Sequence, residues 1–132
     1  NVSTRFKGWG WSIQLLYKLM ANSFVNKKVD LTSTSVTTLY TVPTATTGVI
    51  KSILVSEDSG NADTITVTIT DTSDAVFSLF KTKSISANAT TELLTGPLVL
   101  EESEVLKVTA ATANRLHVVA SVLEIKPREV TT

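Results

Sequence analysis

A chain of 132 residues has room for one hydrophobic core, and its hydrophobic fraction of 42% is ordinary for a globular protein. The chain contains no cysteine, which excludes a disulfide framework and a thiolate metal site. Serine and threonine together make 36 of the 132 residues, an excess that suits strands and turns and argues against a mainly helical body.

The net charge of zero conceals a difference between the N-terminal fifth and the rest of the chain. Residues 1–28 carry five basic residues and no acidic residue, whereas residues 29–132 carry seven basic and twelve acidic residues. Five of the eight aromatic residues also lie in residues 1–28. We therefore expect a basic, aromatic arm over residues 1–33, a mildly acidic, aliphatic domain over residues 34–126, and a short polar tail over residues 127–132.

The arm contains one segment with a helical pattern. Ser12 can cap a short helix over residues 13–21, whose apolar stripe consists of Ile13, Leu16, Tyr17 and Met20. Nine residues are too few for a stable isolated helix, so the segment must dock on another surface. Packing on its own body is one option. We favour docking on a neighbouring subunit, because Trp, Tyr and Arg are common interface anchors and the arm is opposite in charge to the body. The expected interface residues are Arg5, Phe6, Lys7, Trp9, Trp11, Leu15, Leu16, Tyr17 and Phe24.

Other interpretations of the arm are less favoured. A secretory signal needs a longer apolar run than this one, which Gln14 and Lys18 interrupt. A membrane span needs about 20 apolar residues, so no membrane contact is expected. The dispersed basic residues argue only weakly for nucleic acid, which is not an expected partner. Residues 20–23, Met-Ala-Asn-Ser, resemble a translation start, so residues 1–19 are expected to be an upstream extension.

Strand patterns recur every eight to twelve residues between residues 34 and 126. The clearest is residues 64–70, where Ile65, Val67 and Ile69 alternate with threonine. Residues 84–94 form a weaker, edge-like strand broken by Asn88. Residues 116–125 are apolar on both faces, which predicts a central strand buried on both sides. The eight expected strands are residues 35–42, 49–56, 64–70, 75–81, 84–94, 98–100, 105–110 and 116–125.

These strands predict an all-β fold. A strand with one apolar face needs a second layer to cover it. We therefore expect an eight-stranded antiparallel β-sandwich of two four-stranded sheets, jelly-roll or Ig-like in topology, with an extended N-terminal arm that contains a short helix. The pattern leaves the strand order open.

Candidate catalytic and metal-binding residues are few. His117 is the only histidine, and Ser121, four residues further along the same strand, would lie about 13 Å away, too far for a hydrogen bond. One histidine cannot provide a zinc site, and no Gly-rich phosphate loop is present. We expect no enzyme activity, no cofactor and no metal. Two oxygen-rich loops are expected to be solvated turns and not calcium sites: Glu57, Asp58, Asn61 and Asp63, and Asp71 with Asp74.

Several stretches of the body resemble a known group of proteins. Residues 38–43 (Thr-Leu-Tyr-Thr-Val-Pro) and 48–53 (Gly-Val-Ile-Lys-Ser-Ile) look like the opening hairpin of small β-sandwich structural proteins of tailed bacteriophages. Residues 92–94, 98–100 and 119–125 are similar to their later strands, so the resemblance covers residues 36–126. It implies a location in the virion.

The expected function is that of a non-enzymatic virion structural protein, first of all a capsid decoration or cement protein. A neck or tail component is the alternative. The expected partners are the major capsid protein or neck and tail proteins, together with further copies of the chain in a homo-oligomer. A carbohydrate-binding module is favoured less, because such modules usually bind sugars through exposed aromatic residues. The aromatic residues of the body, Tyr40, Phe77 and Phe80, are expected to be buried.

Overall fold

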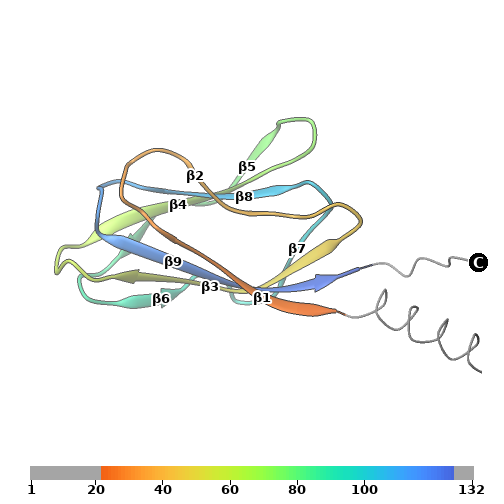
Figure 1. Cartoon of the computed structure of the whole chain (residues 1–132). Coiled ribbons are helices and arrows are strands. Elements are labelled where there is room, and N and C mark those ends of the chain that lie inside the picture. Colours follow the sequence, from red (N-terminus) through yellow and green to blue (C-terminus); the bar gives the residue numbers. More distant parts are fainter. Residues whose placement is uncertain (1–21, 127–132) are drawn as a thin grey trace, which may run out of the picture.

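The computed structural model describes residues 22–126, which form nine strands in two antiparallel sheets. Figure 1 shows the sheets as two layers of a β-sandwich. The five-stranded sheet has the order β1-β9-β3-β6, with β7 also paired to β3, and the four-stranded sheet has the order β2-β8-β4-β5. No helix within residues 22–126 is long and apolar enough to cross a membrane. The strands are β1 (Ser23–Asp30), β2 (Thr37–Thr41), β3 (Thr47–Glu57), β4 (Asp63–Thr70), β5 (Val76–Ile85), β6 (Thr90–Glu92), β7 (Leu98–Leu100), β8 (Val105–Ala110) and β9 (Leu116–Ile125).

The prediction of an all-β fold is confirmed, and each predicted strand region contains a strand. The predicted break at Asn88 is also found, since β5 ends at Ile85, β6 begins at Thr90, and Asn88 between them has a φ of 56°. The expected count of two four-stranded sheets is wrong, because a ninth strand, β1, makes one sheet five-stranded. The predicted helix over residues 13–21 lies outside the described residues.

The additional strand β1 belongs to the segment that the sequence places in the arm. It pairs with β9 along its whole length, from Ser23 opposite Glu124 to Asp30 opposite His117. Its inward side carries only two apolar residues, Val25 and Val29, which pack against the core. Residues 23–30 are therefore part of the body, held mainly by backbone pairing to β9 and only weakly marked by hydrophobic alternation.

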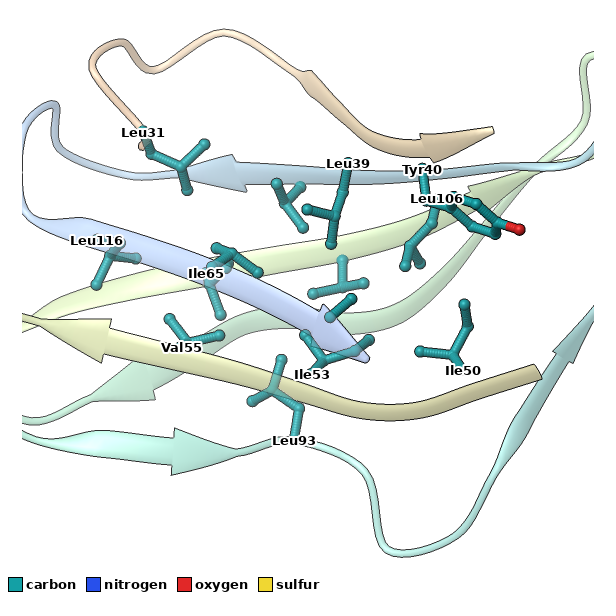
Figure 2. Close-up of a cluster of buried hydrophobic side chains, with 14 of the residues drawn as sticks. Leu31, Leu39, Tyr40, Ile50, Ile53, Val55, Ile65, Leu93, Leu106 and Leu116 are labelled. Carbon is teal, nitrogen blue, oxygen red and sulfur yellow. The ribbon is translucent and has the colours of Figure 1, made fainter. Parts of the chain in front are cut away.

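The core lies between the two sheets and is built from their inward-facing side chains (Figure 2). Strand β9 is central, between β1 and β3, as predicted. The prediction that both of its faces are buried is wrong, because Val119 and Ile125 on its outward face are each 36% exposed. Within the described residues no layer covers the outer face of the five-stranded sheet. The core residues include Ile53 and Val55 from β3, Ile65 and Val67 from β4, Leu106 and Val108 from β8, and Leu116, Val118, Ala120 and Val122 from β9.

Tyr40 connects the two sheets at one end of the sandwich. Its hydroxyl donates a hydrogen bond of 2.7 Å to Oε2 of Glu124, and both residues are buried. Burial raises the pKa of Tyr40 above its usual range, and the hydrogen bond and negative charge of Glu124 raise it further. The ring lies against Gly48, where an added Cβ would stand 2.9 Å from Cε2 of Tyr40. Glycine at this position leaves the space that the ring needs.

Candidate interaction surface

The most exposed apolar surface on the five-stranded sheet is a row of side chains across its outer face. Phe24 on β1 pairs with Leu123 on β9, Leu123 pairs with Val49 on β3, and Val49 pairs with Val99 on β7. Phe24 is 77% exposed and Val99 is 57% exposed. We call these four residues the outer row. Val49 and Leu123, between Phe24 and Val99, are partly buried. A continuous apolar row with two exposed ends is typical of a surface that another molecule covers.

The rest of this face is more polar. The next paired residues along the strands are Asn26, Ser121 and Ser52, which separate the outer row from a smaller apolar pair, Val119 and Leu54. Leu54 is 40% exposed. The apolar surface is therefore concentrated at the end of the sheet that carries the outer row.

Both ends of the described chain leave from this same end of the sheet. Ser23, the first residue of β1, lies opposite Glu124 near the end of β9, and Figure 1 shows the two strand ends side by side. Residues 1–21 therefore join the body directly beside Phe24, the first member of the outer row. The basic, aromatic part of the sequence is thus attached next to an exposed apolar surface.

An acidic turn, residues 101–104, lies at this end as well. It follows β7, whose last residue, Leu100, pairs with Gly48, and Thr47 pairs with Ile125 at the end of β9. Glu101 and Glu102 are exposed. The turn is held by Glu104 Oε1, which accepts a 2.7 Å hydrogen bond from the Glu101 N–H. It carries three glutamates, of which Glu102 Oε1 accepts a 2.7 Å hydrogen bond from the Ala45 N–H in the β2–β3 loop, and Glu101 directly follows the end of β7.

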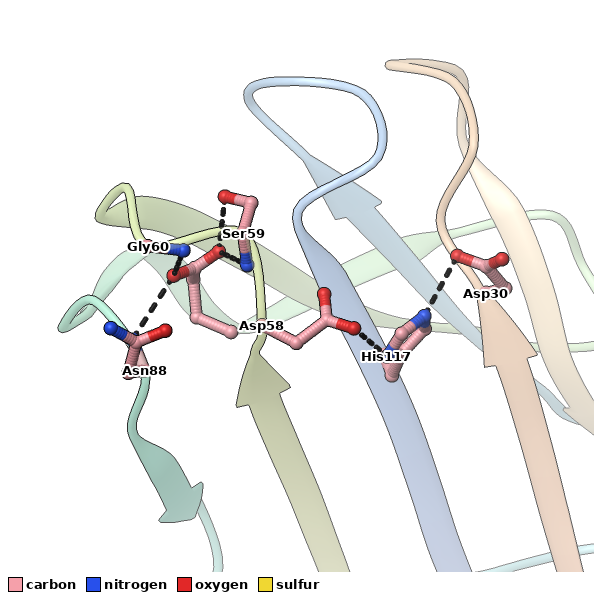
Figure 3. Close-up of polar contacts among 7 residues, drawn as sticks. Asp30, Asp58, Ser59, Gly60, Asn88 and His117 are labelled. Atoms are coloured by element: carbon pink, nitrogen blue, oxygen red, sulfur yellow. Dashed lines mark hydrogen bonds and ion pairs between the residues drawn. The ribbon is translucent and has the colours of Figure 1, made fainter.

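The only histidine, His117, pairs with Asp30 at the end of β1 that is opposite Phe24. Figure 3 shows it between Asp30 and Asp58. His117 Nε2 is 3.2 Å from Asp30 Oδ1, and its Nδ1 is 3.5 Å from Asp58 Oδ2. The imidazole thereby connects β1, β9 and the loop after β3. Both ring nitrogens face carboxylates, and the arrangement includes no hydroxyl nucleophile, so it has the form of a surface contact between strands.

Glu57 differs from the solvated acid that the sequence predicts, because it is only 2% exposed. Its carboxylate accepts hydrogen bonds from the N–H groups of Ser59 at 2.6 Å, Gly60 at 3.0 Å and Asn88 at 3.1 Å, and from the Ser59 hydroxyl. Burial alone would raise the pKa of Glu57, but these hydrogen bonds outweigh burial and lower the pKa to about 2. Glu57 therefore joins the β3–β4 loop to the β5–β6 loop.

The other acidic residues of the two oxygen-rich loops also hold backbone. Asp63 is 7% exposed, so the expectation of a solvated loop is wrong for this residue too, and its Oδ2 accepts a 3.1 Å hydrogen bond from the Thr112 N–H. Asp71 Oδ1 accepts hydrogen bonds from the N–H groups of Ser73 and Ala75 in an exposed turn. Among residues 22–126, no group of three or more His, Cys, Asp or Glu side chains is arranged to hold a metal ion.

A second apolar feature lies along β5, the edge strand of the four-stranded sheet. The prediction that the aromatic residues of the body are buried is correct for Tyr40 but wrong for Phe77, which is 54% exposed, and for Phe80, which is only partly buried. A groove of about 330 Å³ lies between β5 and the segment that joins β6 to β7. It is lined by Leu79, Phe80, Leu93, Leu94, Thr95, Gly96, Pro97 and Leu98.

Of the interface residues that the sequence predicts, Phe24 lies within the described residues, and it is the most exposed large hydrophobic residue there. It belongs to the outer row, which sequence analysis did not find, since its members come from four separate strands. The other predicted interface residues lie outside the described residues: Arg5, Phe6, Lys7, Trp9, Trp11, Leu15, Leu16 and Tyr17.

The sequence matches no protein-family model, and it matches no curated protein. The function must therefore be argued from the surface itself.

Proposed function

We propose that this protein is a non-enzymatic structural protein of a bacteriophage particle that binds its neighbours through its N-terminal segment. The observation that carries the proposal is the exposed outer row beside the point where a basic, aromatic segment joins the body. Covering apolar surface of this kind with another molecule removes it from water, which is favourable. A segment with two Trp residues is suited to such an interface. The resemblance of the strand pattern to phage β-sandwich proteins supports the setting in a virion.

Capsid decoration or cement is the first choice within this proposal, and a neck or tail component is the second. A segment that ties one subunit to the next suits a shell that is stabilised by many repeated contacts. Buried apolar surface contributes about 25 cal/mol per Å², and the cost of ordering the segment reduces this gain, so one contact is weak. Many such contacts repeated around a shell hold the subunits together firmly. A count of copies per purified particle separates the two roles, because a shell requires many more copies than a ring.

The proposal is tested by deleting residues 1–19 from the gene in a phage that produces the protein. We expect the shortened protein to keep its β-sheet circular dichroism, since the core between the sheets lies wholly within residues 31–122. We expect it to be lost from purified particles. The matched control is Val36→Glu, at an apolar residue that is 64% exposed and lies outside the strands. Full incorporation of the shortened protein would refute the proposed anchoring role.

A carbohydrate-binding module is the second candidate, and the exposure of Phe77 favours it more than the sequence does. Phe77 and the neighbouring groove along β5 could present an apolar surface to a sugar ring. Binding of the full chain to a glycan array, abolished by Phe77→Ala, would support this role. No binding to any glycan would leave the structural role as the better proposal.

A further inference from the structure

We infer that the outer row is the binding site for residues 13–21 of a second copy of this chain. The inference deepens the proposed function, on which it rests, because it names both the partner and the surface that receives the N-terminal segment.

The dimensions of the row match those of the segment. The row crosses four neighbouring strands, β1, β9, β3 and β7. Strands are about 4.8 Å apart, so the row is about 14 Å long. Residues 13–21, as the short helix that the sequence predicts, would be about 13.5 Å long at 1.5 Å per residue. A helix lying across the strands would therefore cover the row from Phe24 to Val99.

The chemistry of the two surfaces is also complementary. The predicted stripe of Ile13, Leu16, Tyr17 and Met20 is apolar along its length, and so is the row. The most exposed members of the row, Phe24 and Val99, stand at its two ends, where a helix of this length would cover both. The segment cannot be stable as a helix alone, and contact with the row would supply the packing that it lacks.

Charge complementarity supports the same location. Arg5 and Lys7 precede the predicted helix, and residues 1–21 contain no acidic residue. The exposed Glu101 is two residues after Val99 in the chain, at the start of the acidic turn, whereas Glu102 is bonded to the Ala45 N–H in the β2–β3 loop. A helix that enters the row from the Val99 side would bring the basic residues before it toward the end of the sheet where Glu101 is exposed. Opposite charges on two partners steer them together and fix their orientation.

The place where the segment joins the body allows exchange between two copies. Each copy carries its own row next to the C-terminal end of its own segment, because Phe24 is in the row and Ser23 begins β1. Two copies related by a two-fold axis can therefore each place a segment on the row of the other. Such an interface is closed and uses the same surface twice.

The test uses tryptophan fluorescence, because both tryptophans, Trp9 and Trp11, precede the predicted helix and the described body contains none. In the full chain we expect blue-shifted emission and a dimer by analytical ultracentrifugation, both lost on dilution. Val99→Glu and Phe24→Glu should each weaken dimerisation at least tenfold and shift the emission to the red. Val36→Glu, which adds the same charge at an exposed apolar residue away from the row, should change neither.

A mixing experiment separates a second copy from the chain's own segment. Val99→Glu keeps its segment but has a damaged row. A full chain with Leu16→Glu, Trp9→Phe and Trp11→Phe keeps its row, has a damaged segment and contains no tryptophan. Adding an excess of the second variant should restore the blue shift of the first, since one intact segment then meets one intact row.

Other outcomes would overturn the inference in distinguishable ways. A blue shift that does not depend on concentration, lost in Val99→Glu and not restored by mixing, would assign the row to the chain's own segment. A dimer unaffected by Val99→Glu and Phe24→Glu would mean that the segment binds elsewhere, and the proposed assembly role would stand. A monomer at every concentration, in a protein that still incorporates into particles, would assign the segment to a different virion protein.

Discussion

The contact between Tyr40 and Glu124 provides the sharpest test of how the two sheets are joined. Replacing Tyr40 by Phe removes one hydroxyl and keeps the ring. In the wild type this hydroxyl donates a 2.7 Å hydrogen bond to Glu124 Oε2. The exposed fractions are 2% for Tyr40 and 8% for Glu124, so water cannot readily replace the lost donor.

The expected cost follows from the chemistry of the acceptor. A hydrogen bond to a charged group contributes about 1.5–3 kcal/mol, and leaving a buried acceptor without a partner costs a similar amount. We therefore expect Tyr40→Phe to lower the free energy of unfolding by about 2 kcal/mol. The change should be smaller in a Glu124→Gln background, because a neutral acceptor makes a weaker bond.

Gly48 offers an independent perturbation of the same contact. In Gly48→Ala, the new Cβ would stand 2.9 Å from Cε2 and 3.1 Å from the hydroxyl oxygen of Tyr40, so the ring must move. Overpacking of this kind costs about 1–3 kcal/mol. Because the moving ring takes its hydroxyl away from Glu124, the double variant with Tyr40→Phe should lose less than the sum of the two single losses.

The measurement is urea unfolding followed by far-UV circular dichroism, since the tryptophans lie in residues 1–21 and do not report directly on the sandwich. A Tyr40→Phe variant within 0.5 kcal/mol of wild type would refute the reasoning. Strictly additive losses in the double variant would also refute it.

Two further predictions concern a buried acid and the core. Glu57 has a pKa of about 2 in the folded chain against an ordinary value of 4.5. Its stabilising effect is therefore complete above about pH 4.5 and is lost as the pH falls towards 2. Glu57→Gln should lower the melting temperature at pH 7 and approach wild type near pH 2. Val36→Ala, which changes no titratable group, should show no such pH dependence, and a constant difference for Glu57→Gln would contradict the assignment. Leu106→Ala should cost about 2–5 kcal/mol in urea unfolding because Leu106 is fully buried, whereas Val36→Ala should stay within about 0.5 kcal/mol; equal losses would show that the core is misplaced.

The eight strand regions could be predicted because their signal is local. In β4, threonine alternates with Ile65, Val67 and Ile69, and this period fixes which side chains share a face before any partner strand is known. Turn residues such as Pro43 and Gly60 mark the ends of strands by their own backbone preferences. Strand β1 lacks such a signal, because its residues show little apolar alternation. It is a strand because it pairs with β9, more than 80 residues further along the chain.

The outer row could not be predicted, because Phe24, Val49, Val99 and Leu123 become neighbours only through the register of three strand pairs. The exposure of a strand face could not be predicted from the sequence either. Strand β9 is apolar on both faces in the sequence, and whether a second layer covers its outer face depends on the arrangement of the sheets.

The amino-acid sequence by itself determined the class of the fold and the separation of a basic, aromatic segment from an aliphatic body, because period, composition and charge are properties of neighbouring residues. The tertiary structure alone decided that β1 completes the sheet and that the outer row is exposed. It also placed the row beside the point where the basic, aromatic segment joins β1. Pairing between distant strands and the burial that follows from it are properties of the assembled sandwich, which no local pattern carries.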